Sequence, residues 1–227
     1  MKPVTSTFQR ARRPEQLAAR RSAILTAARA ALSEKGVDGV TLRDISERVG
    51  LAKSNVLRYF DTREAILLEV LHEECRDWVA ELERQLGRPR ARKPGYATEI
   101  RFAGVVTDTL VERRLMCELL GAMAGVLERN ISGQFARDFK VRVMQSIATV
   151  SELAARQLPW LPDEFAAFFG EGTLSLVAGM FPFSVPTESM RDVISELGFP
   201  DPHTRFVEGL RTGLVTWLIG AAAQSPA

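Results

Sequence analysis

The chain has 227 residues, of which 46% are hydrophobic and 26% are charged, and this ordinary globular composition excludes a largely disordered protein. Its net charge of +2 hides an asymmetry: residues 1–60 hold 12 Lys and Arg against 5 Asp and Glu, giving +7, whereas residues 61–227 hold 18 against 23, giving −5. The longest weakly polar run, residues 212–223, is too short to cross a bilayer, and no apolar run follows the basic N-terminus. We therefore expect a cytoplasmic protein with neither a membrane span nor a secretory signal.

The first predicted helix follows a basic N-terminal segment. Residues 1–14 show no periodicity and end at Pro14, so we expect a flexible basic arm there. From Glu15 onward, apolar residues recur at helical spacing until Gly36, a natural helix C-cap. These apolar residues are Leu17, Ile24, Leu25, Ala28, Ala31 and Leu32.

Two short helices are predicted next, separated by a tight turn. Thr41 can cap a helix whose third position is Asp44, which is close to a capping box, and that helix ends at Gly50. After Leu51 and Ala52, a third helix runs from Lys53 to Tyr59 or Phe60. The inward-facing apolar residues of the two helices are Leu42, Ile45, Val49, Val56 and Phe60.

The remaining chain is predicted to be helical throughout. Asp61 and Glu64 give another capping pattern, for a helix that continues to Leu86. A basic, proline-flanked loop over residues 87–95, expected to be mobile, precedes helices predicted at 96–112, 113–128, 132–158, 163–181, 188–197 and 202–223. No useful alternating strand pattern occurs, so the fold class is all-α.

Two short helices joined by a glycine turn and supported by a longer helix are typical of a helix-turn-helix, which places its last helix in the major groove of DNA. The excess positive charge of residues 1–60 suits a polyanionic partner. The third helix offers side chains that the core does not need: Lys53, Ser54, Asn55, Leu57, Arg58 and Tyr59. Lys and Arg bind phosphates or guanine, and Asn binds adenine. The alternative interpretation is that these side chains form only the solvent-exposed polar face that any amphipathic helix has.

Residues 24–68 resemble the N-terminal domain of the TetR family of repressors. The matching motifs are Ile24-Leu25-x-Ala27-Ala28, Glu34-Lys35-Gly36, Thr41-Leu42-Arg43-Asp44-Ile45, Gly50-Leu51-x-Lys53, Tyr59-Phe60 and Arg63-Glu64-Ala65-Ile66. The resemblance implies an all-α fold, with a three-helix DNA-binding domain at residues 15–61 and a larger helical ligand-binding and dimerisation domain at residues 62–227.

The resemblance also implies roles for individual residues. Phosphate contacts would come from Thr41, Lys53, Tyr59 and Arg63, and groove contacts from Arg43, Ser54, Asn55, Leu57 and Arg58. Two positions depart from the family pattern: Ala52 replaces the usual Ser or Thr cap of the third helix, and Leu57 stands where Tyr is common. Losing the cap costs about 1 kcal/mol of helix stability.

In the resembling family, the last two long helices form the dimer, which corresponds here to residues 163–181 and 202–223. Both contain small residues that would let helices approach closely, namely Gly170, Gly172, Ala178 and Gly179 in one and Gly209, Gly213 and Gly220 in the other. Packing within one subunit is the alternative explanation. A two-fold dimer would present two recognition helices about 34–36 Å apart to a pseudo-palindromic operator in double-stranded DNA.

A ligand cavity is expected among the aromatic and Met residues of the second domain, since Met adapts to varied ligands. The candidates are Trp78, Phe102, Met116, Met123, Phe135, Phe139, Met144, Trp160, Phe168 and Phe169. The alternative is that these residues form plain core. The expected ligand is small, hydrophobic and organic.

Other functions find little support in the sequence. It has no Walker loop and no Gly-x-Gly-x-x-Gly, Gly-x-Ser-x-Gly or His-Glu-x-x-His motif, so we expect no enzyme, cofactor or metal site. Among the possible metal ligands at residues 72–75, only His72 and Cys75 have the i, i+3 spacing that shares a helix face, and Arg76 lies beside them, so a metal site is not expected there. Cys75 and Cys117 are expected to be buried free thiols. A helical protein-interaction module without DNA binding remains the alternative function.

Overall fold

The computed structural model describes the backbone of residues 5–224 and the side chains of residues 14–224. Every regular element within residues 5–224 is helical, which confirms the all-α prediction. The α-helices are α1 (Thr5–Gly39), α2 (Leu42–Val49), α3 (Lys53–Val56), α4 (Arg63–Leu86), α5 (Ala97–Val111), α6 (Arg114–Met123), α7 (Gly133–Gln157), α8 (Asp163–Met180), α9 (Glu188–Glu196) and α10 (Pro202–Gln224). The short 3-10 helices are η1 (Pro94–Tyr96), η2 (Leu127–Asn130) and η3 (Phe181–Ser184).

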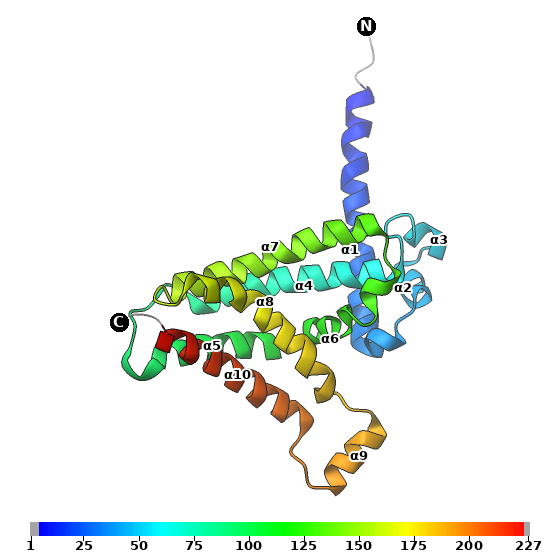
Figure 1. The fold of residues 1–227 in the computed structure, drawn as a ribbon. Helices are drawn as coiled ribbons and strands as arrows, with labels where there is room; N and C mark the ends of the chain where they lie inside the picture. The colour runs from blue at the N-terminus through cyan, green and yellow to red at the C-terminus, as the bar shows by residue number, and fades with distance from the viewer. Residues whose placement is uncertain (1–4, 225–227) are drawn as a thin grey trace.

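The first three helices form a small head at one end of the molecule (Figure 1). Helix α1 packs against α2 and α4, and α2 packs against α3. Their shared core is fully or almost fully buried and contains Ile24, Ala28, Leu32, Ile45, Val56 and Phe60. These are the residues that the apolar periodicity assigned to the inner face, because side chains three and four positions apart share one face of a helix.

Helix α1 begins at Thr5, ten residues before the expected start. The predicted arm is therefore wrong for residues 5–14, which are helical and contain Pro14 within the helix, while residues 1–4 lie outside the described residues. A proline inside a helix removes one backbone hydrogen bond, and here the helical backbone continues across it. The predicted end is present as a break: Gly36 has φ 67° and ψ 176°, and one more turn follows to Gly39.

The remaining helices form the body around α4. Helix α4 contacts α5, α6 and α7, and further pairs form between α7 and α8, α6 and α8, and α5 and α10. Helices α4 and α7 run side by side along the body, whereas α9 projects from its edge (Figure 1). Because α4 packs against both head and body, the expected domain boundary at residues 61/62 stays a prediction.

The expected helices of the body are found within one or two residues of their predicted ends, apart from the stretch 113–128. There α6 ends at Met123, and η2 follows only from Leu127. Gly125 lies in this interruption, where glycine lowers helix stability. Of the loop predicted at residues 87–95, residues 87–93 have no regular structure, whereas Pro94 and Gly95 begin the short 3-10 helix η1.

Both cysteines are buried free thiols, which confirms the sequence-based expectation. Burial raises the pKa of Cys75 and of Cys117 to about 12, because the thiolate form loses hydration. Reactivity requires the thiolate, so these thiols are inert packing groups in the folded protein.

One stretch, Asp163–Ser184, is long and apolar enough to cross a membrane by length and composition. In this fold 44% of it is buried, and its helix α8 packs between α6, α7 and α10. Core helices pass the same test of length and composition, so the stretch is weak evidence for a membrane span.

The glycines of α8 and α10 divide into two groups. A Cβ at Gly170 would lie 2.5 Å from the Ile147 carbonyl oxygen, and Cβ atoms at Gly209 and Gly213 would lie 2.5 Å and 3.1 Å from Met180 and Leu176. These glycines therefore permit close packing within one chain. Gly179 and Gly220 face open space, with no atom within 4 Å.

We predict that Gly170→Ala lowers the free energy of unfolding by about 1–3 kcal/mol, because the added methyl group overlaps backbone of α7. Gly179→Ala, in the same helix, is the matched control and should be neutral or stabilising by up to about 1 kcal/mol, since alanine favours helix. Urea unfolding measures both variants. Equal effects would contradict the close packing of α7 and α8.

Candidate nucleic-acid interface

The start of α2 is fixed by a complete capping box. The Thr41 hydroxyl accepts a hydrogen bond from the Asp44 amide at 3.2 Å, and the Thr41 amide donates to Asp44 Oδ2 at 2.8 Å. Lys35 Nζ lies 2.6 Å from Asp44 Oδ1. The hydrogen bond from Lys35, followed by those from Thr41, holds the pKa of Asp44 well below its usual range. This pairing ties the end of α1 to the start of α2.

The turn between α2 and α3 depends on Gly50. Its φ of 68° lies in the left-handed region that favours glycine, and its amide bonds back to Glu47 and Ser46 carbonyls. Helix α3 then spans only Lys53–Val56, and a further turn reaches Phe60 through the bonds from Tyr59 and Phe60 amides to the Val56 carbonyl. Ala52 provides no side-chain cap, which is consistent with so short a helix.

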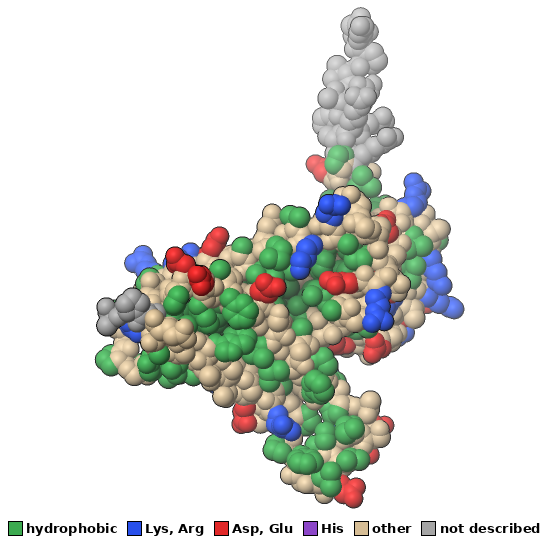
Figure 2. Space-filling view, viewed as in Figure 1, with side chains coloured by type: hydrophobic (Ala, Val, Ile, Leu, Met, Phe, Trp, Pro, Cys, Tyr) green, Lys and Arg blue, Asp and Glu red, His purple; other side chains and the backbone are tan. Residues whose placement is uncertain are grey.

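Helix α3 and the turn after it present an exposed polar surface. Val56 is fully buried, and Phe60 is 3% exposed, so these two residues anchor the segment in the head. Facing outward are Lys53, Ser54, Asn55, Leu57 and Arg58, while Tyr59 is half-buried. No carboxylate among the described side chains pairs with Lys53 or Arg58. Lys and Arg side chains are visible along the outer edge of the head (Figure 2).

Two further basic residues border this surface. Arg43 on α2 is exposed and pairs with Glu47 one turn later at 2.6 Å. Arg20 on α1, which sequence reasoning missed, lines a hollow of about 360 Å³ together with Asn55 and Arg58. The position of Arg20 on the polar face of the first predicted helix is a signal that could have indicated a role in this surface. Arg43 has a carboxylate partner, whereas Arg20, Lys53 and Arg58 have none among the described side chains, so the outward surface carries positive charge of the kind that phosphates attract.

Arg63 lies behind this surface and is engaged inside the head. Its Nε donates to the Val40 carbonyl at 2.6 Å, a terminal nitrogen donates to the Val37 carbonyl, and the other lies 3.0 Å from Glu64. The side chain is 18% exposed. Arg63 thus joins the last turn of α1 and the residue after it to the start of α4, and its predicted phosphate contact stays a prediction.

Arg21 supports the rear of the candidate recognition segment. One of its terminal nitrogens donates to the Tyr59 carbonyl at 2.6 Å, and its guanidinium lies 4.2 Å from the centre of the Phe60 ring. Glu69 lies 4.0 Å from Arg21 and also pairs with Arg142 of α7. Sequence reasoning missed this network, although a charged Arg21 three positions before buried Ile24 is an available signal.

The body contacts the head at a second point. Glu118 of α6 accepts a hydrogen bond from the Val37 amide at 2.8 Å. A Cβ at Gly36 would lie only 2.9 Å from the same carboxylate oxygen, so glycine allows this approach as well as the positive φ. The Ser132 hydroxyl before α7 also bonds Asp61 at 3.0 Å. These contacts join α6 and the start of α7 to the segments on either side of the helix-turn-helix.

The predicted ligand residues do not converge on one cavity in this structure. Core packing buries Trp78, Phe102, Met116, Phe139 and Phe169. The Trp78 indole donates to Thr109, and Phe102 lies 5.5 Å from Phe169 between ring centres. Met123, Phe135 and Trp160 are half-buried. The indole of Trp160 donates a hydrogen bond to the buried carboxylate of Glu99. Met144 lines a groove of about 390 Å³ between α7 and α8, and Phe168 packs at the surface on Trp217. Their role in ligand binding stays a prediction.

No group of three or more metal-ligating side chains occurs among the residues that the structure describes. His72 is half-buried, and burial lowers its pKa. Its Nδ1 has no hydrogen-bond partner among the described residues.

Comparison with known proteins covers both parts of the chain. Residues 24–70 match the family described as bacterial regulatory proteins of the tetR family, and residues 72–225 match the tetracyclin repressor-like C-terminal domain. Over 72 residues, or 32% of this chain, the sequence is 36% identical to the HTH-type transcriptional regulator RutR of Escherichia coli. That match covers 34% of RutR, so it spans about a third of the length of this relative.

Solved structures resemble the whole fold. FadR from Bacillus subtilis, in complex with stearoyl-CoA, superposes with a TM-score of 0.51 at 16% identity, over 86% of this chain and 98% of FadR. The repressor AlkX from Dietzia superposes with a TM-score of 0.52 at 14% identity, over 89% of this chain and 96% of AlkX. At these identities the likeness extends to the fold alone.

We predict that Arg63→Ala lowers the free energy of unfolding by about 2–3 kcal/mol, because two backbone carbonyls of the head lose a charged donor. Arg43→Ala is the control: its side chain is 70% exposed, and its loss should leave stability almost unchanged. Thermal unfolding followed by circular dichroism compares the two. Wild-type stability in the Arg63 variant would show that the half-buried guanidinium does not hold the head together.

Proposed function

The chain belongs to the TetR family of bacterial regulatory proteins, and we propose that it is a dimeric repressor which a small organic ligand releases from its DNA operator. As a member, it is a transcriptional regulator with a DNA-binding N-terminal domain. The observation that carries the proposal is the exposed surface of α3. Val56 and Phe60 anchor the segment in the core of the head, and its polar and basic side chains face outward.

DNA recognition is proposed to divide between two sets of residues. Lys53, Thr41 and Tyr59 border the α3 surface and suit backbone phosphates, which position the protein without reading sequence. Ser54, Asn55, Leu57 and Arg58, with Arg43 beside them, suit base edges in the major groove. The alternative function, an interaction module without DNA binding, finds no support among the related proteins.

The dimer is proposed to form through α8 and α10. Ser175 and Gly179 lie on the exposed face of α8, and Thr212, Thr216 and Gly220 form an exposed row on α10. Small side chains allow two helices to approach closely, which suits the pairing of two copies. Such a dimer sets the distance between two heads, and therefore its fit to two half-sites about one helical turn apart.

The ligand is proposed to act by changing how the body holds the heads. It releases DNA only if it binds a body conformation other than the one that fits the operator. Glu118 and Ser132, which reach the two ends of the helix-turn-helix, supply the contacts for that coupling. FadR, which shares the fold, binds an acyl-CoA, and we take the effector of this chain to be an organic molecule as well. We also place the protein in the cytoplasm and assign it no enzymatic activity.

We predict different effects from the two sets of DNA-contacting residues. Lys53→Ala should weaken binding to all DNA sequences and reduce the slope of log K against log salt by about 1, because one phosphate contact is lost. Asn55→Ala should instead change base preference at one position of each half-site, at a cost of about 1–3 kcal/mol for the preferred base. An operator selected from random DNA and titrated at several salt concentrations measures both effects.

Arg88→Ala, in the exposed loop at the end of α4 that is distant from the head, is the control for charge removal, and it should bind DNA as the wild type does. Unchanged affinity and unchanged slope in both the Lys53 and Asn55 variants would remove α3 from the DNA interface.

We predict that Glu118→Ala loosens the head by removing the acceptor of the Val37 amide. Amide hydrogen exchange at Val37 should become roughly tenfold faster, as expected for a lost bond of about 1.4 kcal/mol, and operator affinity should fall. Glu112→Ala, at an exposed position just before α6, is the control and should change neither quantity. The coupling would be contradicted by equal Val37 exchange in wild type and variant.

A further inference from the structure

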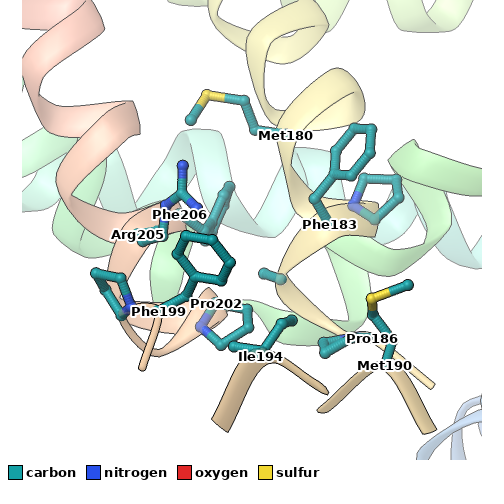
Figure 3. Close-up of a pocket in the computed structure, with 12 residues that line it drawn as sticks. Met180, Phe183, Pro186, Met190, Ile194, Phe199, Pro202, Arg205 and Phe206 are labelled. Atoms are coloured by element: carbon teal, nitrogen blue, oxygen red, sulfur yellow. The ribbon is translucent and has the colours of Figure 1, made fainter. Parts of the chain in front are cut away.

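A pocket of about 560 Å³ lies at the edge of the body, between η3, α9 and the start of α10. Its volume is in the range of small-molecule sites. Figure 3 shows Phe199 and Phe206 on one side, Phe183 on the other, and Met190 and Ile194 contributed by α9. The site is separate from the core that holds the predicted ligand residues, none of which lines it.

The apolar lining of this pocket is not covered by the chain itself. Helix α9 and its C-cap carry an apolar stripe formed by Met190, Val193, Ile194 and Leu197, and no residue of α9 is buried. Phe183 is 81% exposed, and Phe199 is 56% exposed. Exposed apolar residues that are scattered singly over a surface are normal in proteins. Exposed apolar residues that cluster around one hollow are instead typical of a binding site. The projecting α9 region carries the same cluster of apolar side chains in Figure 2.

One charged side chain enters the lining, that of Arg205 on α10. No carboxylate lines the pocket, and none among the described side chains pairs with Arg205. Asp201, one turn before it, is directed elsewhere: its Oδ1 accepts bonds from the Thr204 amide at 2.8 Å and the Thr204 hydroxyl at 3.0 Å. Those bonds lower the pKa of Asp201, so it stays ionised as the cap of α10. Arg205 is left to meet an anion from outside.

We propose that this pocket binds an aromatic carboxylate, with its rings among Phe183, Phe199 and Phe206 and its carboxylate on Arg205. Aromatic rings and Met sulfur pack favourably against a flat aromatic body, and a guanidinium binds a carboxylate through two parallel hydrogen bonds. The single positive charge in an otherwise apolar lining selects an organic anion over a neutral or cationic molecule of the same shape.

The pocket is also connected to the head, a consequence that rests on the proposed function. Pro182 in its wall packs on Gly121 of α6, where a Cβ would lie 2.9 Å from Pro182 Cγ. Glu118, three residues earlier on α6, holds the Val37 amide. A ligand that displaces η3 therefore pushes on the helix that fixes the head, and we assign this pocket to the effector.

Binding is tested without DNA, with 2-naphthoate as the probe and 2-naphthamide as its uncharged analogue of the same shape. Isothermal titration of the full chain should give at least tenfold tighter binding of the carboxylate. Arg205→Gln should abolish this preference, whereas Arg211→Gln, on the same helix but outside the lining and paired with Asp108, should keep it. Circular dichroism verifies that both surface variants are folded.

Three results would overturn the proposal. The first is equal binding of 2-naphthoate and 2-naphthamide by the wild type, or no binding of either. The second is a carboxylate preference that survives in Arg205→Gln. The third is loss of self-association in Phe199→Asp by sedimentation, with no effect of Arg205→Gln on the probe, which would assign the apolar face to a second copy. Operator binding without the probe is measured separately, so failure of this site and failure of the DNA-binding function are distinguishable.

Discussion

The arrangement of the head depends on the segment 37–40, which is the last turn of α1 after the break at Gly36 and the residue that follows it. Arg63 binds its carbonyls at Val37 and Val40 from α4, and Glu118 binds its amide at Val37 from α6. A buried or half-buried backbone group without a partner is costly, so these two side chains decide where the segment can lie. One comes from the helix shared by head and body, and the other comes from the body alone. The head is therefore oriented by the body rather than attached to it by a free linker.

The recognition segment depends on this scaffold more than on its own helix. Helix α3 has four residues and lacks a side-chain cap, so its isolated stability is low. Val56 and Phe60 anchor the recognition segment in the core of the head, and Arg21 of α1 donates a hydrogen bond to the Tyr59 carbonyl in the turn that follows α3. This arrangement leaves the outward side chains free of structural roles. Glu69 contacts both Arg21 and Arg142. A chain of contacts therefore connects α7, through Arg142, to the turn that follows α3.

The parts of the structure that the sequence could predict are those set by neighbouring residues. Thr41 and Asp44 form a capping box, Gly50 adopts a left-handed turn, and Val56 faces inward, all through contacts within a few positions. The start of α1 was predicted too late because residues 1–14 lack apolar periodicity and Pro14 indicates a boundary before a helix, although the helical backbone continues through it. The fold class and the polar surface of α3 followed from the same local patterns.

The parts that could not be predicted depend on contacts between distant residues. Glu118 meets Val37 across 81 positions, and no periodicity encodes that pairing. Residues that pack in a core and residues that line a cavity produce the same apolar periodicity along a helix. The sequence therefore could not show that Trp78 and Phe102 are core residues. The pocket beside α9 was not predicted for a related reason: its wall combines two proline-containing connections, on either side of α9, with residues of α9 and α10.

The central claim is that α3 enters the major groove of DNA in two copies set apart by the body. Protection of guanine N7 atoms from dimethyl sulfate on a selected operator tests it most directly, because N7 is exposed only in the major groove. The account predicts two protected patches about one helical turn apart on one face of the duplex. Protection confined to the minor groove, or a single patch at saturating protein, would contradict it.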